Sequence, residues 1–287
     1  MTDSLPMPIS APLTPAQRTR VLNLVRRAAR AEIMPRFRAL SADDIAQKTG
    51  PQDLVTEADR RAEAMIARGL VQMFPNALIV GEEDASQNAD IIAKIAEAEM
   101  AFTIDPVDGT WNYANGLTQF GVILSVTRFG VPVFGVLYDP VMDDAVVADE
   151  VGPAQMLQPR RAPRTLSASA GGEVADLAGF AGLYHLPEAK RVAMAATFPK
   201  FSRAMSLRCA CHEFRMLAQG HVDFVLSAGL TPWDHAAGAL IGRRAGCHVA
   251  MLDGSDYRAD TRDGYLLAAA NLATWNRLRD LWSFLSE

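Results

Sequence analysis

The chain has few cysteines and contains no long hydrophobic run. Its three cysteines, Cys209, Cys211 and Cys247, are an odd number and cannot all pair within one chain. They argue against a disulfide-built secreted domain and favour a reducing compartment. No segment approaches the roughly 20 uninterrupted apolar residues of a membrane-spanning helix, and the opening residues, MTDSLPMPISAPLTP, lack the apolar core of a signal peptide. We therefore expect a cytoplasmic protein without a membrane partner.

Basic residues are also in slight deficit. Lys and Arg total 28 against 33 Asp and Glu, which gives a formal net charge of −5 at pH 7. Because contacts to nucleic-acid phosphates need a basic face, we do not expect nucleic acid as a partner. The notable basic cluster, Arg160, Arg161 and Arg164, is interpreted as a solvated loop. Hydrophobic residues make up 49% of the chain, which is enough apolar material for a core and excludes disorder throughout.

Two amphipathic helices are expected early in the chain, after a flexible proline-rich arm at residues 1–13. Thr14 followed by a proline is a typical helix start, and apolar residues at helical spacing continue to a stop before Pro35. A second helix is predicted over residues 56–73, with Thr56 as its cap. Both helices carry their apolar residues on one stripe.

Short apolar runs between turn signals predict the strands of the first half. Residues 77–80 and 100–104 are interpreted as buried strands, and each ends abruptly in acidic residues. Three β-rich runs then indicate an antiparallel meander: 120–129, 131–138 and 144–149.

A stretch rich in Pro, Arg, Ala and Gly, residues 152–172, is predicted to be a boundary. Beyond it, helices are expected near 188–197, 211–219, 235–244 and 273–285, and strands near 224–226, 248–252 and 266–270. This alternation favours an α/β half. We therefore divide the chain into the arm, an N-terminal α+β half (14–152) with an antiparallel sheet and most candidate metal ligands, and a C-terminal α/β half (153–287) that supplies Asp234.

The informative feature of the sequence is the position of its acids. Glu82 and Glu83 directly follow one apolar strand, and Asp105 and Asp108 follow another. Asp234 opens an apolar helix. Hard divalent cations take several oxygen ligands, and Mg²⁺ takes carboxylates together with waters and phosphate oxygens of the substrate. The acids at these strand ends therefore indicate a metal site.

The residues after Asp105 add the parts of a phosphate site. Pro106 fixes the backbone between the two aspartates, so the carbonyl of Val107 can point with them to one place. A tight turn or helix start at Gly109 and Thr110 would present backbone N–H groups to an anion. The Thr110 hydroxyl would hold an attacking water, with Asp59 or Glu83 as its base.

Each of these acids also has an ordinary structural interpretation. Asp234 alone is typical of a helix cap, Glu82 and Glu83 of a solvated turn, and Asp59 of a helix surface. The run at residues 105–110 alone is also compatible with a turn, because Asp, Pro and Gly are turn formers. Their combination at the ends of buried runs favours a common site.

Four blocks of the sequence together resemble the inositol monophosphatase family. They are DLVTEAD at residues 53–59, GEE at 81–83, IDPVDGTWNY at 104–113 and PWDHAAG at 232–238. Their order and spacing match the family from about residue 21 to the C-terminus. The resemblance implies an α/β (α+β) fold, the layered αβαβα sandwich of the inositol monophosphatase and fructose-1,6-bisphosphatase type. It also implies a lithium-sensitive, Mg²⁺-dependent phosphomonoesterase that forms a homodimer and hydrolyses a small phosphorylated polyol or sugar.

The same resemblance implies a role for each matching residue. Glu82, Asp105 and the Val107 carbonyl would bind the first metal ion. Asp105, Asp108 and Asp234 would bind the second, and a weaker third ion would also interact with Glu82; Mn²⁺ would substitute for Mg²⁺. Thr110 would activate the water, oriented by Asp59 with Glu83 nearby. Asp108 and the N–H groups of Gly109 and Thr110 would hold the phosphate.

The sequence departs from the family at positions that contact the substrate. Ser227 stands where inositol phosphatases carry a glutamate that grips sugar hydroxyls, and Arg208 lies in a segment that is small and Gly-Thr-rich in the family. Two interpretations of Arg208 stay open: contact with a second anionic group, and a plain surface or structural arginine. The nearby Cys209 and Cys211 are interpreted as buried thiols rather than zinc ligands.

These departures leave the substrate open. The alternatives within the phosphatase class are fructose-1,6-bisphosphate, histidinol phosphate and 3′-phosphoadenosine 5′-phosphate. An alternative of another class is a scaffold that binds RNA or a transcription complex, as some proteins that resemble this family do.

Overall fold

The first helix begins where its cap predicts. The computed structural model describes residues 13–286, and in it α1 (Pro15–Ala28) starts after Thr14. The Thr14 side chain accepts the Gln17 backbone N–H, and the Thr14 backbone N–H donates to the Gln17 side chain. The helix then passes into a π-helical turn (Ala29–Ile33). The predicted arm lies outside the described residues except for Leu13, which is buried in the core rather than part of a loose segment.

A seven-stranded sheet forms the first β layer. Its strand order is β3-β4-β5-β6-β7-β8-β9, with β3 parallel to β4 and every other pair antiparallel. The strands are β3 (Leu78–Gly81), β4 (Ala101–Asp108), β5 (Gly121–Arg128), β6 (Val131–Asp139), β7 (Asp144–Asp149), β8 (Gln155–Leu157) and β9 (Arg164–Thr165). The predicted meander is therefore confirmed as β5, β6 and β7.

A five-stranded mixed sheet forms the second β layer, in the order β11-β10-β12-β14-β13. The strands are β10 (Ala178–Ala181), β11 (Arg203–Met205), β12 (Phe224–Ala228), β13 (His248–Met251) and β14 (Tyr265–Ala269). β10 pairs in parallel with β11 and β12, whereas β14 is antiparallel to both of its neighbours.

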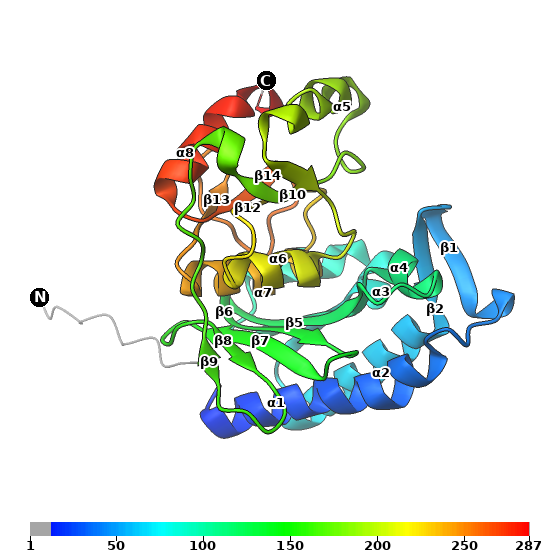
Figure 1. Cartoon of the computed structure of the whole chain (residues 1–287). Helices are drawn as coiled ribbons and strands as arrows, with labels where there is room; N and C mark the ends of the chain where they lie inside the picture. The colour runs from blue at the N-terminus through cyan, green and yellow to red at the C-terminus, as the bar shows by residue number, and fades with distance from the viewer. Residues whose placement is uncertain (1–12, 287) are drawn as a thin grey trace, which may run out of the picture.

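Helices separate and cover the two sheets, as Figure 1 shows. α1 and α2 (Glu57–Met73) pack on the outer face of the seven-stranded sheet. α6 (Ala210–Ala218) and α7 (Pro232–Arg244) lie between the sheets, and α5 (Glu188–Ala195) and α8 (Leu272–Leu281) lie outside the five-stranded sheet. The fold is therefore the layered αβαβα architecture.

Small residues allow the two helices of the middle layer to pack closely together. A Cβ atom at Gly238 on α7 would lie 2.3 Å from the ring of Phe214 on α6, so the helices approach closely only because this residue is glycine. α7 is buried on nearly all sides between the two sheets. Its first turn is thereby held rigidly where the sheets meet.

Short polar elements are where the structure departs from the sequence-based prediction. A hairpin of β1 (Ile45–Gly50) and β2 (Asp53–Thr56) precedes α2. The stretch 152–172, predicted as a boundary, carries β8 and β9, which extend the seven-stranded sheet beyond residue 152. The division of the chain at that residue stays a prediction. Among the described residues, no helix is long and apolar enough to cross a membrane.

Candidate metal and phosphate site

Three aspartates from distant parts of the chain meet at the edge of the first sheet. Asp105 and Asp108 close β4, whose pairing with β5 shifts register between these two residues. Asp234 lies in the first turn of α7. One carboxylate oxygen from each of the three lies within 4.8 Å of the others, and Asp105 and Asp108 are buried. The structure thus brings together three of the predicted metal ligands.

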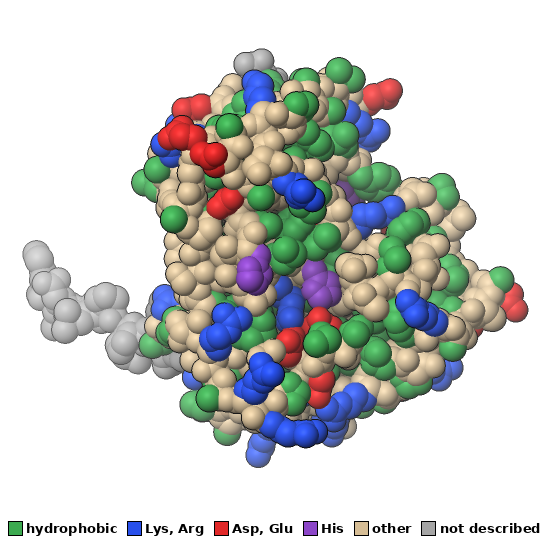
Figure 2. Space-filling view, viewed as in Figure 1, with side chains coloured by type: hydrophobic (Ala, Val, Ile, Leu, Met, Phe, Trp, Pro, Cys, Tyr) green, Lys and Arg blue, Asp and Glu red, His purple; other side chains and the backbone are tan. Residues whose placement is uncertain are grey.

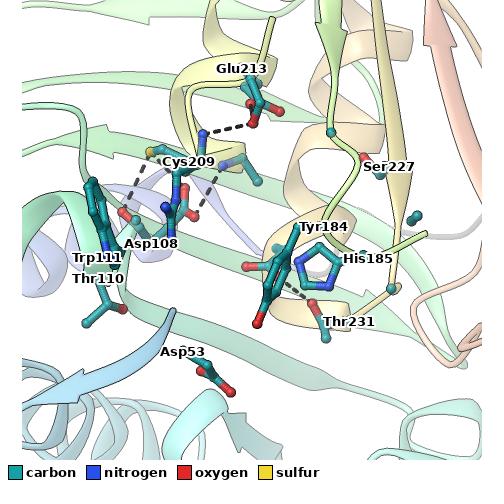
Figure 3. A pocket seen from close by; sticks show the side chains of 18 of the residues that line it. Asp53, Asp108, Thr110, Trp111, Tyr184, His185, Cys209, Glu213, Ser227 and Thr231 are labelled. Carbon is teal, nitrogen blue, oxygen red and sulfur yellow. Dashed lines mark hydrogen bonds between the residues drawn. The ribbon is translucent and has the colours of Figure 1, made fainter. Parts of the chain in front are cut away.

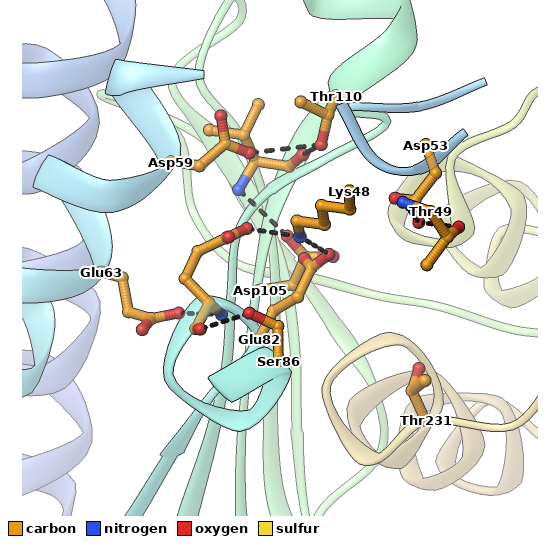
Figure 4. Close-up of polar contacts among 12 residues, drawn as sticks. Lys48, Thr49, Asp53, Asp59, Glu63, Glu82, Ser86, Asp105, Thr110 and Thr231 are labelled. Carbon is orange, nitrogen blue, oxygen red and sulfur yellow. Dashed lines mark hydrogen bonds and ion pairs between the residues drawn. The ribbon is translucent and has the colours of Figure 1, made fainter. Parts of the chain in front are cut away.

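A second group of charged side chains lies at the N-terminus of α3 (Figure 4). Lys48, on the β1–β2 hairpin, places Nζ 2.7 Å from Oε1 of both Glu82 and Glu83. Glu63, on α2, accepts the backbone N–H groups of Glu83 and Asp84 at 2.8 and 3.0 Å. Glu63 therefore caps the turn that carries Glu82 and Glu83. α3 itself spans Glu82–Gln87.

The Thr110 hydroxyl lies between two acceptors. Its Oγ1 is 3.2 Å from Asp59 Oδ1 and 3.0 Å from the carbonyl oxygen of Val107. Asp59 is fully buried, and its Oδ2 accepts the backbone N–H and the hydroxyl of Thr56. This carboxylate is therefore held by the capping box of α2 while its other oxygen faces Thr110.

The turn from β4 into α4 (Thr110–Ala114) depends on Gly109. Its φ is +84°, and a Cβ atom at this position would lie 2.8 Å from the carbonyl oxygen of Gln119. Any other residue would be both strained and obstructed. Because the chain turns within this one residue, Asp108 and Thr110 both line the same cavity.

The start of α6 holds Asp108 from the other side. Its Oδ2 accepts from the Cys211 backbone N–H at 2.5 Å and lies 3.0 Å from the Cys209 thiol, and its Oδ1 accepts from the Ala210 N–H at 3.2 Å. Cys209 and Cys211 are buried and unpaired, as predicted. The segment that differs from the family thus serves here to orient Asp108.

The start of α7 holds Asp234. Thr231 donates its hydroxyl to Asp234 Oδ2 at 2.6 Å. His235, the next residue, keeps its ring within hydrogen-bonding distance of the Thr231 backbone carbonyl (2.9 Å) and is buried. His235 is therefore hydrogen-bonded within its own helix turn.

Burial shifts the titration of these acids. The pKa of Glu82 rises to about 8 and that of Asp108 to about 7, because the charged carboxylates lose hydration and face one another. Burial also holds the pKa of Asp105 well above its usual value. Burial opposes the charge of Lys48, but the carboxylates of Glu82 and Glu83 raise its pKa overall. The site therefore holds more negative charge than its protein partners neutralise.

This donor set fits a hard divalent cation. The three aspartates offer carboxylate oxygens close together, and burial raises the pKa of Asp105 and Asp108, so a cation would stabilise the charged forms of these two. No nitrogen or sulfur ligand stands among the three residues, which favours Mg²⁺ or Mn²⁺ over zinc.

The cluster opens into a cavity of about 610 Å³ between the two sheets, shown in Figure 3. Ser227 and Arg208 both line it. Trp111 lies on one side of the cavity, and Tyr184 and His185 lie across from it.

Two residues of this site are missing from the sequence-based prediction. Glu63 follows Asp59 by one helical turn, so the i, i+4 spacing was a usable signal. Lys48 sits in a polar hairpin of no distinctive pattern, and nothing in the sequence pointed to it.

The surface carries no concentrated basic face on the side seen in Figure 2, where Lys and Arg side chains are dispersed among other types. Arg160, Arg161 and Arg164 are exposed, but Arg164 lies in β9, so the predicted solvated loop is right for Arg160 and Arg161 and wrong for Arg164. Arg164 donates to Gln219, the residue that follows α6, at 3.1 Å.

Comparison with known proteins identifies the family. Residues 15–283 match the profile of the inositol monophosphatase family. The chain belongs to the inositol monophosphatase family. The chain is 30% identical over 250 residues to the Nus factor SuhB of Vibrio cholerae, covering 83% of this chain and 87% of that protein. It is 29% identical over 224 residues to a fructose-1,6-bisphosphatase/inositol-1-monophosphatase of Thermotoga maritima, covering 77% and 80%.

Solved structures of inositol monophosphatases share the fold. The Thermotoga maritima IMPase superposes with a TM-score of 0.76 at 22% identity and covers 94% of this chain and 99% of its own. The extragenic suppressor protein suhB of Bartonella henselae gives a TM-score of 0.77 at 24% identity, covering 93% and 98%. Relatives of this family carry phosphatase names, and the carboxylate cluster of this chain suits a metal ion.

Proposed function

We propose that this protein is a Mg²⁺-dependent phosphomonoesterase that hydrolyses a small phosphorylated polyol or sugar with a metal-activated water. The observation that carries the proposal is the convergence of Asp105, Asp108 and Asp234 beside a hydroxyl that faces a buried carboxylate. Neither an ordinary helix cap nor a surface turn accounts for two buried aspartates and a half-buried one whose carboxylate oxygens lie within 4.8 Å of one another.

The metal-binding part of the proposal assigns ligands to residues. Glu82, Asp105 and the Val107 carbonyl would hold one ion, and Asp105, Asp108 and Asp234 would hold a second. Bound there, the ions would supply a water of lowered pKa and neutralise charge on the oxygens of the phosphoryl group. Glu82 would also support a weaker third ion. The Lys48 ammonium group neutralises part of the charge on Glu82 and Glu83.

The remaining steps fall to side chains of this chain. Thr110 accepts a hydrogen bond from the attacking water, which directs a lone pair of that water at the phosphorus, and Thr110 donates its own hydroxyl hydrogen bond to Asp59. Glu83 supports the same water from the α3 side. Gly109 and Thr110 present their N–H groups to the phosphate at the start of α4. Arg208 and Ser227 contact the remainder of the substrate from the cavity wall.

A substrate panel tests the proposal. Phosphate release is measured from inositol 1-phosphate, fructose 1,6-bisphosphate, histidinol phosphate and 3′-phosphoadenosine 5′-phosphate, with Mg²⁺, with EDTA and with added Li⁺. We expect Mg²⁺-dependent turnover of at least one compound, abolished by EDTA and inhibited by Li⁺. Turnover that persists in EDTA would contradict the proposed metal chemistry. Light scattering in the same buffers checks the expected homodimer.

A second candidate function rests on the relatives named Nus factor SuhB. Such names favour a role in a transcription complex, in which the fold would serve as a binding scaffold. The exposed arginines at 160, 161 and 164 are the candidate contacts. Salt-dependent binding of RNA without any phosphatase activity would favour this function over the first.

A further inference from the structure

Arg208 places a positive charge in a cavity lined mainly by acids and neutral groups. Of the cavity-lining residues in the described part of the chain, it is the one lysine or arginine. The side chain is exposed and precedes α6 directly. A lone cation facing the space that receives a substrate is a candidate contact for an anionic group.

The guanidinium is fixed by uncharged partners. It stacks on the indole of Trp111 with Cζ 4.1 Å from the ring centroid. Its Nη1 donates to Gln52 Oε1 at 2.9 Å, and its Nη2 to the Gln52 carbonyl at 3.4 Å. Among the described residues no carboxylate lies within ion-pair distance of Arg208, although the same cavity contains several. Partial burial lowers the pKa of Arg208, and the nearby Tyr184 offsets this only in part.

The backbone of Arg208 adopts a strained conformation. Arg208 has a φ of +55°, in the left-handed region where glycine is unstrained. The Glu213 carboxylate holds the segment by accepting the Leu207 N–H at 2.7 Å and the Ser206 hydroxyl at 3.2 Å. The Arg208 N–H donates in turn to Ser206 Oγ at 3.1 Å. The strained conformation is therefore held by a dedicated set of hydrogen bonds, which points to a use for the side chain.

We infer that Arg208, stacked on Trp111, binds a second anionic group, a phosphate or a carboxylate, of a substrate whose scissile phosphate lies at the aspartate cluster. The inference rests on the proposed function and narrows its substrate class to phosphomonoesters that carry a further negative charge. Ser227 agrees with this class, because a serine on β12 brings no carboxylate that would repel the second anion. Arg208 is thus a specificity-determining residue for the site.

Matched substrate pairs test the inference. The pairs are fructose 1,6-bisphosphate against fructose 1-phosphate, and 3-phosphoglycerate against glycerol 3-phosphate, which differ by a phosphate and by a carboxylate. The measured quantity is the ratio of kcat/KM within each pair. In Arg208→Gly, which removes the charge and suits a positive φ, we expect this ratio to fall about tenfold or more in at least one pair. Arg208→Lys should restore part of the ratio.

Gln52→Ala is the matched control for an indirect role. It removes the side-chain contact between Arg208 and the β1–β2 hairpin but keeps the charge, so it should leave the ratio as in the wild type. If Gln52→Ala lowers the ratio as much as Arg208→Gly does, Arg208 acts through the hairpin and the inference is wrong. An unchanged ratio in Arg208→Gly, with a normal melting temperature, also overturns it.

Binding provides a readout that does not depend on turnover. Calorimetric dissociation constants for the same pairs are measured in a Thr110→Ala background, with and without Arg208→Gly. We expect the second anion to tighten binding about tenfold or more only where Arg208 is present. Equal dissociation constants with and without Arg208 would contradict the inference. Absence of any hydrolysis by the wild type would instead count against the proposed function, and the binding comparison would still decide the role of Arg208.

Discussion

Thr110 and Asp59 form the smallest unit of the proposed chemistry. A hydroxyl has one proton to donate, and Thr110 has two acceptors within reach, Asp59 Oδ1 and the Val107 carbonyl. Donation to Asp59 leaves the lone pairs of Thr110 available to orient a water. Asp59 cannot swing away, because its other oxygen is held by Thr56 and the residue is fully buried. Orientation of the water is therefore built into the start of α2.

Two substitutions of Thr110 distinguish the contribution of its hydroxyl from that of its branched shape. Thr110→Val keeps the branched side chain and removes the hydrogen bond, so we expect kcat to fall about 10²-fold or more at saturating Mg²⁺. Thr110→Ser keeps the hydroxyl and should lose far less. Initial rates of phosphate release measure both variants. Equal activity of the valine and serine variants would show that the hydroxyl has no part in the reaction.

We expect protonation of Asp59 to cause the fall in kcat at acidic pH. Burial raises the pKa of this carboxyl to about 6. The charged form is the better acceptor for Thr110, so activity should be full above this pH and should fall as the pH drops through about 6. The check is a kcat profile from pH 5 to 9 at saturating Mg²⁺. An Asp59→Asn variant should have low activity without this limb, and a variant that retains the limb would assign it to another group.

The acidic residues of the site could be predicted from the sequence, but the residues that hold them in place could not. Asp105, Asp108 and Glu82 directly follow buried apolar runs, and strand ends of this kind converge at a sheet edge. Lys48 reaches Glu82 only because the β1–β2 hairpin folds over α3, which no local pattern encodes. The use of Cys209 and Cys211 to hold Asp108 depends on contacts across about 100 residues of chain, as the separation of 101 between Cys209 and Asp108 shows.

Among the elements, α3 shows how a side chain from one helix positions the acids of another. The first N–H groups of a helix have no partner within that helix. In α3 two of them, those of Glu83 and Asp84, are satisfied by Glu63 of α2. Burial raises the pKa of Glu63 to about 7. The link fixes the N-terminus of α3 against α2, and with it the direction of Glu82.

Substitution of Glu63 tests this link. Glu63→Ala leaves the buried Glu83 N–H and the part-buried Asp84 N–H without their acceptor, so we expect a loss of about 1–3 kcal/mol in the free energy of unfolding at pH 8. Glu63→Gln keeps one carbonyl acceptor and removes a buried charge, so it should lose less. Urea denaturation measures both. The same stability for alanine and glutamine variants would show that the cap does not contribute.

The long helices could be predicted from the spacing of apolar residues in the sequence, whereas the shortest strands could not. The two helices with caps at Thr14 and Thr56 were predicted with nearly correct starts, because cap and apolar stripe agree there. β8 and β9 have three and two residues and lie in a stretch rich in Pro and Arg. β8 pairs with the open edge of β7, and β9 pairs with β8, so both strands depend on the assembled sheet.

The layered arrangement of the whole molecule brings charged residues from different layers to one site. β4 from the first sheet and α7 from the middle layer contribute the three aspartates, and α2 and the hairpin contribute Asp59 and Lys48. The cluster costs folding energy when no cation is bound, because carboxylates with raised pKa values must ionise in a buried place. Metal binding and folding stability are therefore expected to be linked.

Stability of the metal-free protein should depend on pH in a defined direction. The pKa values of Asp59, Glu63, Asp108 and Glu82 are raised to about 6, 7, 7 and 8. A raised carboxyl pKa means that the folded state binds more protons than the unfolded state, so stability is lost as pH rises from about 4.5 to 8. We expect a loss on the order of a few kcal/mol in EDTA, largely reversed by Mg²⁺.

Thermal unfolding at pH 5.5, 6.5 and 8 in EDTA and in Mg²⁺ measures this linkage. Asp105→Asn is the control, since it removes one charge from the cluster and should flatten the dependence on pH. A melting temperature in EDTA that rises steadily to pH 8, or one that Mg²⁺ leaves unchanged at pH 8, would contradict the account of the cluster.

Asp105→Asn tests whether the aspartate cluster binds the cation needed for hydrolysis. The measurement is phosphate release from the best substrate of the panel, by the wild type and by the variant, over a full Mg²⁺ titration. We predict that the wild type turns over with Mg²⁺ and that the variant, folded by circular dichroism, has lost nearly all activity at every Mg²⁺ concentration. A folded Asp105→Asn protein with wild-type activity would contradict the claim.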